Sequence, residues 1–191
     1  MTELGNGLFA AKHYEEAVSV EEANLSMLRR VSASRRDVLT MQSNLASTYK
    51  DLGRVDEALQ MRREVYSGFV QLYGEEHGES LREAFNYAND FFDLKRFEEA
   101  KALLRKAVPV ARRVRGESDA ITLKMRAVYA NALYEDPGAT LDDLSEAATT
   151  LEDTERTSRR VLGGAHPLTA SIMKHLLFAR MALLARETPD A

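Results

Sequence analysis

One stretch of this sequence occurs twice, 42 residues apart, and this repetition limits the fold more than any other feature. Residues 44–58 carry the pattern Asn-Leu-Ala-x-x-Tyr-x-x-x-Gly-Arg-x-x-Glu-Ala, and residues 86–100 carry the related pattern Asn-Tyr-Ala-x-x-Phe-x-x-x-Lys-Arg-x-x-Glu-Ala. Shorter matches precede the pair at an offset of 41 (residues 13–17) and follow it at an offset of 47 (residues 144–147). The insertion that lengthens the last offset lies at the turn-forming segment 136–139. A fixed period of this length is typical of proteins built from stacked structural repeats.

The residues within each repeat favour helix. Only 4 prolines and 10 glycines interrupt the chain, apolar residues recur every three or four positions, and no strand-like alternation is sustained. We therefore predict an all-α protein in which each repeat is a hairpin of two helices, called A and B. The predicted A helices cover 2–11, 37–52, 79–94, 120–135 and 167–186; the predicted B helices cover 14–31, 55–73, 97–115 and 141–162.

Small residues recur at one place in each helix. They are Gly5, Ala46, Ala88 and Ala130 in the A helices, and Ala17, Ala58, Ala100 and Ala147 in the B helices. Two helices can cross closely at such points because little Cβ bulk separates them. A hairpin of this kind cannot bury its apolar face alone, so the prediction is an α-solenoid of antiparallel hairpins with a concave and a convex surface. The chain is expected to be one array over 1–191: a partial repeat 1–33, repeats 34–74, 75–116 and 117–163, and a terminal capping helix 164–191.

The pattern resembles the tetratricopeptide repeat, in the longer-period form found in kinesin light chains. The resemblance is carried by the run at 44–58, its copy at 86–100 and the junction Leu162-Gly163-Gly164-Ala165-His166-Pro167. It implies a right-handed superhelix that acts as a protein-interaction scaffold, with one face of the A helices lining the concave groove. It also implies a protein or peptide partner rather than a substrate.

The junctions between hairpins predict helix ends. Gly74, Gly116 and Gly163 are expected to end B helices in the left-handed conformation, with a polar residue capping the next helix and Pro167 in its first turn. Thr140 and Asp143 have the spacing of an N-terminal cap. Pro109 should kink or interrupt the third complete B helix. The four histidines show no ligand spacing, and His77 and His166 occupy cap positions, so no metal site is predicted.

The predicted binding residues follow the small position of each A helix. Asparagine both donates and accepts hydrogen bonds, so a ladder of asparagines suits the main chain of an extended peptide, and neighbouring aromatic rings would contact its side chains. The predicted groove residues are Asn44, Ser47, Lys50, Asn86, Asn89, Phe92, Asp93, Lys124, Asn131 and Tyr134. The alternative is that the asparagines bridge neighbouring helices and the aromatic rings belong to the core.

Several other functions are disfavoured by what the sequence lacks. Ser43, Ser47, Phe85, Asn86, Lys124 and Val128 would make a poor clamp for a C-terminal carboxylate. The absence of cysteine excludes zinc ribbons and thiol catalysis, and the net charge of −4 disfavours duplex DNA. Without a phosphate-binding loop or a nucleophile motif, neither an enzyme nor a cofactor is expected.

Arginine pairs such as Arg62-Arg63 are expected on a solvated face. No apolar run is expected to reach the roughly 20 residues of a membrane span, and a cytoplasmic protein is predicted. The rival hypothesis is a self-assembling module that pairs through its two ends, because the last helix is rich in apolar residues such as Leu177 and Met181.

Overall fold

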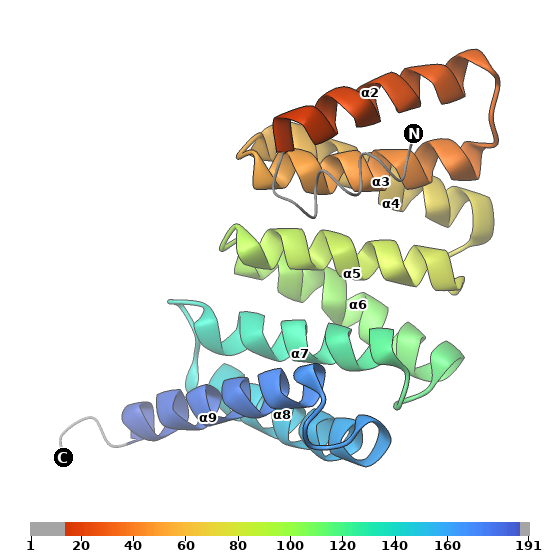
Figure 1. Cartoon of the computed structure of the whole chain (residues 1–191). Helices are drawn as coiled ribbons and strands as arrows, with labels where there is room; N and C mark the ends of the chain where they lie inside the picture. Colours follow the sequence, from red (N-terminus) through yellow and green to blue (C-terminus); the bar gives the residue numbers. More distant parts are fainter. Residues whose placement is uncertain (1–13, 188–191) are drawn as a thin grey trace. The chain divides into compact units, whose positions relative to one another are not determined.

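The computed structural model describes residues 14–187, and there it contains helices joined by short connections and no strand (Figure 1). The helices are α2 (Tyr14–Arg30), α3 (Arg35–Asp51), α4 (Val55–Tyr73), α5 (Gly78–Asp93), α6 (Phe97–Arg115), α7 (Ala120–Glu135), α8 (Leu141–Leu162) and α9 (Pro167–Glu187). Each of these helices begins and ends within two residues of its predicted position. The helices predicted from the repeats are therefore confirmed over this range. The first predicted A helix, 2–11, lies outside the described residues.

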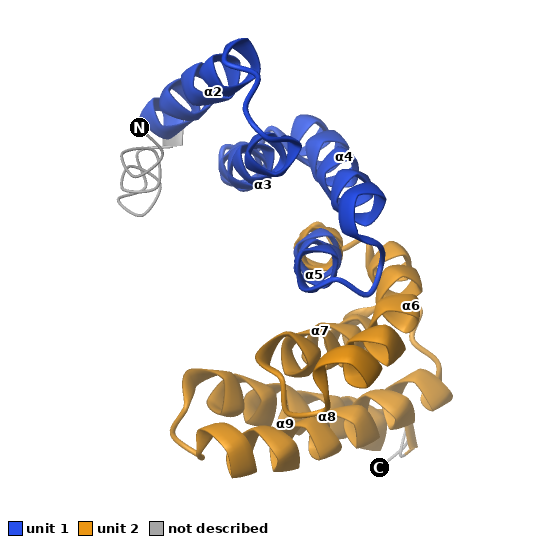
Figure 2. Ribbon diagram, turned by 90° about the vertical axis from the view of Figure 1, so that its right-hand side faces the viewer, with its two compact units in different colours: residues 1–87 blue, residues 88–191 orange. Residues whose placement is uncertain are grey.

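The chain forms two compact units, residues 1–87 and 88–191, and the boundary between them in the sequence falls within α5 (Figure 2). In the first unit, α3 packs against both α2 and α4. Its core is made of apolar side chains from these helices: Val18, Leu25, Met41, Leu45, Tyr49 and Ala58, with Leu39, Val65 and Phe69 in a second cluster. In the second unit, α7 packs against α6, α8 and α9, and α8 also packs against α9.

The small residues are buried, as expected if helices cross closely at these positions. Ala46, Ala88 and Ala130 of the A helices have no exposed surface, and neither do Ala100 and Ala147 of the B helices. An added Cβ at Gly68 in α4 would approach a methyl carbon of Leu39 in α3 to 2.6 Å, so a larger residue here would force the Leu39 side chain to shift.

The turns from an A helix to its B helix explain why the repeated motif keeps its residues. Gly53, with φ of 80°, ends α3 in the left-handed region, and the Arg54 N–H donates to the Tyr49 carbonyl (2.9 Å). The Arg54 guanidinium lies 4.0 Å from the centre of the Tyr49 ring and also pairs with Glu57. The aromatic, glycine, arginine and glutamate of the motif thus hold one turn together.

The second copy of this turn has the same hydrogen bonds around a different residue. Lys95 stands where the first copy has glycine, and it adopts a φ of 60°. The Arg96 N–H donates to the Phe91 carbonyl (2.8 Å), and the Arg96 guanidinium lies over the Phe91 ring and pairs with Glu99. A non-glycine residue in the left-handed region carries a steric penalty of about 1–2 kcal/mol.

The turns from a B helix to the next A helix differ from the prediction in one respect. Gly74, Gly116 and Gly163 have positive φ (84°, 89° and 88°), but their ψ values of 166°, 164° and 158° place them in the extended, glycine-only region and not in the left-handed helical one. The reason is that the chain continues directly into a capped helix. After the first and last of these glycines, His77 and His166 accept backbone N–H bonds at Nδ1 (3.2 and 3.1 Å), which confirms their capping role.

The inserted turn before α8 is anchored to its neighbour. Thr140 and Asp143 form the predicted capping box. Asp136 accepts a hydrogen bond from the Gly138 N–H (2.9 Å). It also forms an ion pair (2.8 Å) with Lys101 of α6, and the Lys101 side chain is buried. Pro109 does not end α6, which runs on to Arg115 although the proline supplies no N–H.

Candidate functional site

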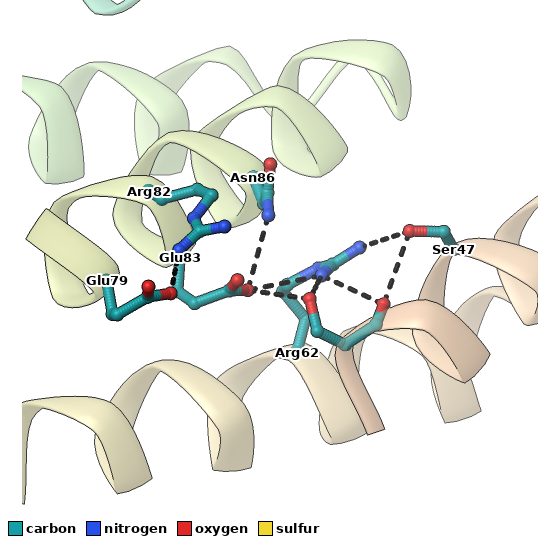
Figure 3. Close-up of polar contacts among 7 residues, drawn as sticks. Ser47, Arg62, Glu79, Arg82, Glu83 and Asn86 are labelled. Atoms are coloured by element: carbon teal, nitrogen blue, oxygen red, sulfur yellow. Dashed lines mark hydrogen bonds and ion pairs between the residues drawn. The ribbon is translucent and has the colours of Figure 1, made fainter. Parts of the chain in front are cut away.

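A buried polar network holds α3, α4 and α5 together in the first unit (Figure 3). The Arg62 guanidinium on α4 lies 3.4 Å from the Glu83 carboxylate on α5, and both side chains are almost fully buried (2% and 6% exposed). Ser43 on α3 bridges the pair, because its hydroxyl accepts from Arg62 (2.8 Å) and donates to Glu83 (2.8 Å). The expectation that Arg62 belongs to a solvated face is therefore wrong; Arg63, beside it, is exposed. Arg62 is buried because Glu83 neutralises its charge.

This network occupies two of the predicted groove residues. Ser47 accepts a hydrogen bond from Arg62 (2.8 Å), and Asn86 donates to Glu83 (3.3 Å). Both side chains are half-buried. A peptide could use them only by competing with a charged partner, and such hydrogen bonds are stronger than those between neutral groups.

The other two predicted residues of the first unit lie on α3. Asn44 is half-buried and lines a depression of about 250 Å³ with Leu28, Asp37, Thr40 and Met41, between α2 and α3. Lys50, two turns further along, is also half-buried.

In the second unit, three predicted residues lie at the end of α5. Asn89 donates to Asp93 (3.0 Å), one turn along the same helix; Asn89 is half-buried and Asp93 is exposed. The half-buried Phe92 ring packs edge-on against Phe97 (centroids 5.7 Å apart), and the Lys95 ammonium lies 5.8 Å from the Phe92 centroid.

Tyr134 is the centre of a polar chain that links α7 to α9 and to the turn after α5. Its hydroxyl lies 2.7 Å from His175 Nδ1 and 3.1 Å from Glu135 Oε1, and the other carboxylate oxygen of Glu135 lies 3.7 Å from the Lys95 ammonium. We call Phe92, Lys95, Tyr134, Glu135 and His175 the Tyr134 cluster. Apart from the exposed Lys95, its members are half-buried, so it combines an aromatic surface with groups that donate and accept hydrogen bonds.

The electrostatics of the cluster keep two of its groups uncharged near neutral pH. Burial lowers the pKa of His175, an effect that the negative charge of Glu135 only partly offsets. Burial, followed by the charge of Glu135, raises the pKa of Tyr134 well above its ordinary value. The phenol has one proton, so it donates to either Glu135 or His175 and accepts at its oxygen from another donor.

Asn131 and Lys124, both on α7, complete the predicted set. Lys124 is exposed, and Asn131 is buried with 7% of its surface accessible. The Asn131 Oδ1 atom is buried without a hydrogen-bond partner among the described residues. Because this oxygen has no partner among those residues, the amide does not bridge neighbouring helices through it. An unpaired buried acceptor costs about 1–3 kcal/mol of stability.

The residues that sequence reasoning missed share one signal. His175 pairs with a residue 41 positions before it, and Ser43 with one 40 positions after it, which is close to the repeat period. A search for complementary polar residues about one period apart would have found both contacts. Within residues 14–187, no group of three or more histidine or acidic side chains is arranged to hold a metal ion.

One helix has a property that the sequence reasoning did not expect. By length and composition alone, α9 is the one described helix that could cross a membrane. This property does not contradict the prediction that no apolar run approaches that length, because Lys174, His175 and Arg180 interrupt the apolar residues of α9.

Comparison with known proteins places the chain among helical repeats. Residues 37–113 match the tetratricopeptide repeat family. A putative kinesin light chain of Podosopora anserina with nearly identical tetratricopeptide-like repeats superposes with a TM-score of 0.80 at 21% identity, over 97% of this chain and 86% of that one, and a variant of that protein gives 0.81. BtubC (BKLC) of P. vanneervenii gives a TM-score of 0.78 at 18% identity, over 94% of this chain and 70% of that one. A search of curated protein sequences found no significant match.

These similarities agree with the helical hairpins and with the motif at 44–58 and 86–100. The fold is an α-solenoid of helical hairpins. Repeats of this family generally mediate protein–protein interactions, and proteins built from them are typically non-catalytic and soluble. Residues 37–113 thus match the tetratricopeptide repeat family, and the fold of the chain is similar to that of kinesin-light-chain-like repeat arrays.

Proposed function

We propose that this chain is a scaffold that binds an extended peptide segment of a partner protein on the A-helix side of its second unit. The observation that carries the proposal is the Tyr134 cluster. There the half-buried Tyr134 phenol contacts the His175 imidazole and the Glu135 carboxylate, and the Lys95 ammonium lies near both Glu135 and the Phe92 ring.

Each group suits one part of a peptide. Phe92 and Tyr134 offer apolar ring surface for side chains, while Asn89 and the Tyr134 hydroxyl offer donors and acceptors to the main chain. Asn131 adds an acceptor that a small rotation of its amide would present to a peptide N–H. Binding is expected to be modest in affinity, because an extended ligand loses conformational freedom on capture.

The predicted residues of the first unit are expected to contribute less. Ser47 and Asn86 already bond to the Arg62–Glu83 pair, so a peptide gains little by replacing those bonds. Asn44 and Lys50 on α3, with Asp93 and Lys124 in the second unit, would adjust charge and local contacts.

The test is a pull-down from cell extract with the wild-type chain and the triple variant Asn89→Ala/Asn131→Ala/Tyr134→Ala. The matched control is Ser145→Ala/Thr149→Ala, on the exposed face of α8. Circular dichroism and thermal unfolding confirm that all three proteins are folded. Partners retained by the wild type and the control but lost by the triple variant, with peptides from them binding at least about tenfold more weakly, are the expected result. Identical partner lists from all three proteins would reject this surface.

Self-assembly through the two ends of the array remains the alternative. Light scattering over a concentration series distinguishes the two functions: growth in mass with concentration supports assembly, and a constant monomer mass rejects it as the main role.

A further inference from the structure

Helix α9 exposes an apolar stripe from residue 173 to residue 184. Met173, Leu177, Met181 and Leu184 follow one another at intervals of three or four residues and are 43–65% exposed, and Phe178 lies beside them. The opposite side of α9 is in the core, where Ile172 and Ala179 are almost completely buried. Exposed apolar surface that is continuous in this way marks an interaction site more often than isolated exposed residues do.

The preceding A helix shows what normally covers this stripe. At the offset of 47 residues, Met173, Leu177 and Phe178 of α9 correspond to Arg126, Ala130 and Asn131 of α7, which are all at most 9% exposed. In α7 these positions are covered by the helices that pack against it, which are α6, α8 and α9. In this fold, therefore, the face that α9 leaves open receives another helix.

The covering helix cannot approach as closely as a regular B helix does. The close crossing uses Ala46, Ala88 and Ala130 in the earlier A helices, whereas α9 has Leu177 there, 57% exposed. A helix packed on α9 must lie further out or carry small residues opposite Leu177. The stripe is thus suited to a helix that differs from those of the array.

The charges beside the stripe indicate the chemistry of that helix. Lys174 lies on one flank, with its ammonium 5.6 Å from the centre of the Phe178 ring, and Arg180 lies on the other. Arg180 pairs with Glu152 of α8 at 3.0 Å, but both side chains are half exposed, so this pair is weak and open to exchange. Between Pro167 and Arg186, α9 contains no acidic residue.

We propose that this face of α9 docks an amphipathic helix of a partner protein, with an apolar stripe and acidic residues on both flanks. A second copy of the chain packed symmetrically through α9 would bring Lys174 and Arg180 against their own equivalents, which is unfavourable. Insertion of α9 into a membrane would remove Ile172 and Ala179 from the core of the second unit. An acidic helix satisfies the stripe and both flanking cations together.

The experiment uses the full chain and a fluorescent synthetic helix of about 20 residues, with leucine and alanine on one face and glutamate on both flanks. A control peptide has lysine in place of each glutamate. Two variants alter the docking face: Leu177→Ser/Met181→Ser removes apolar contact, and Lys174→Glu/Arg180→Glu reverses the flanking charge. These side chains are largely exposed, so circular dichroism is expected to show unchanged helicity.

The wild type is expected to bind the glutamate peptide at least about tenfold more tightly than the lysine peptide. Each variant should lose at least about tenfold in affinity for the glutamate peptide, and the charge-reversed protein should instead prefer the lysine peptide. The triple groove variant Asn89→Ala/Asn131→Ala/Tyr134→Ala should bind the glutamate peptide as the wild type does, so the two proposals fail separately.

Three results would overturn the proposal. The first is no binding of the glutamate peptide up to about 1 mM. The second is concentration-dependent dimerisation in sedimentation equilibrium that Leu177→Ser/Met181→Ser abolishes, which would assign the face to a second copy. The third is binding to phosphatidylserine vesicles, sensitive to the same variants, without binding of the peptide, which would assign it to a membrane surface.

Discussion

The two units solve the same packing problem with different chemistry. At a position four residues after the small residue of each B helix, the first unit has a charged side chain and the second unit has leucine, and all of these are buried: Glu21 and Arg62 against Leu104 and Leu151. In the A helix that follows Arg62, the position five residues before the small residue is Glu83, whereas the second unit has Met125 or Ile172 at this position.

This difference shows that the position in the repeat determines whether a side chain is buried, but not whether that side chain is charged or apolar. Leucine, methionine and isoleucine at these positions remove apolar surface from water without any further requirement. Arg62 and Glu83 must each lose their hydration, and their attraction and the hydroxyl of Ser43 only offset that loss. A buried ion pair of this kind adds little to the free energy of unfolding. Removing one partner, however, lowers that free energy strongly, because the other charge stays buried without its partner.

The largest expected effect comes from breaking the pair on one side. Glu83→Met leaves the Arg62 guanidinium buried without its carboxylate, and we expect a loss of about 3–5 kcal/mol in the free energy of unfolding. Urea denaturation followed by circular dichroism measures it. The matched control is Glu99→Met, which breaks the exposed pair with Arg96 and should cost at most about 1 kcal/mol. Similar losses for the two variants would mean that the burial of Arg62 has no energetic consequence.

The double variant Arg62→Leu/Glu83→Met gives the first unit the residues of the second. We expect it to recover the whole of the single-variant loss, with a free energy of unfolding between the wild-type value and about 4 kcal/mol above it. The four proteins of the double-mutant cycle yield the coupling energy directly. If the double variant is as unstable as the sum of the single ones, Arg62 and Glu83 are not energetically coupled and the comparison fails.

A smaller effect is expected at the paired turns. Gly53→Lys places a side chain in the left-handed region and should destabilise the first unit by about 1 kcal/mol, and Lys95→Gly should stabilise the second by up to that amount. The gain at Lys95 is reduced by the loss of its weak pair with Glu135. Urea unfolding measures the change in the free energy of unfolding for both variants, and the two changes should have opposite signs. If Lys95→Gly is destabilising instead, the contacts of this lysine contribute more to stability than its backbone conformation costs.

The smallest effect concerns pH, and it should differ between the units. Burial lowers the pKa of His175, so its contribution to the second unit is present above about pH 6.5 and is lost as the pH falls through the depressed folded value. Burial raises the pKa of Glu21, although the Thr48 hydroxyl partly offsets this, so its contribution to the first unit is complete below about pH 4.3 and is lost as the pH rises through the folded value.

Hydrogen exchange resolved by segment measures both contributions, after correction for intrinsic exchange rates. His175→Gln should flatten the pH dependence of α7 and α9 alone, and Glu21→Gln that of α2 and α3 alone. A change that spreads equally over both units in either variant would contradict the separate electrostatics.

The helices, their order and their bounds were predictable because local signals coincide with the repeat. Apolar periodicity, the glycines at 74, 116 and 163 and the cap at Thr140 act within a few residues of one another, so no distant contact is needed to read them. The burial of Ala46, Ala88 and Ala130 followed from the same register. The first predicted helix lies outside the described residues, and the predicted division into repeats stays a prediction.

The candidate site was predictable only in part. Asn89, Phe92, Asp93 and Tyr134 were named from their register, but the partners Lys95 and His175 were not, since each reaches the site from another repeat or from a turn. The burial of Arg62 was missed because an arginine pair on a helix is usually solvated, and only the carboxylate of Glu83, from another helix, reverses that preference.

By itself, the sequence determined that this chain folds into stacked helical hairpins of the tetratricopeptide type, because repeated apolar and small residues act at fixed spacing. Only the tertiary structure decided which polar side chains are buried, which are paired and which remain accessible. Those properties depend on contacts between helices whose residues are 19 to 41 positions apart, where the loss of hydration of one group is balanced by the charge or hydroxyl of another.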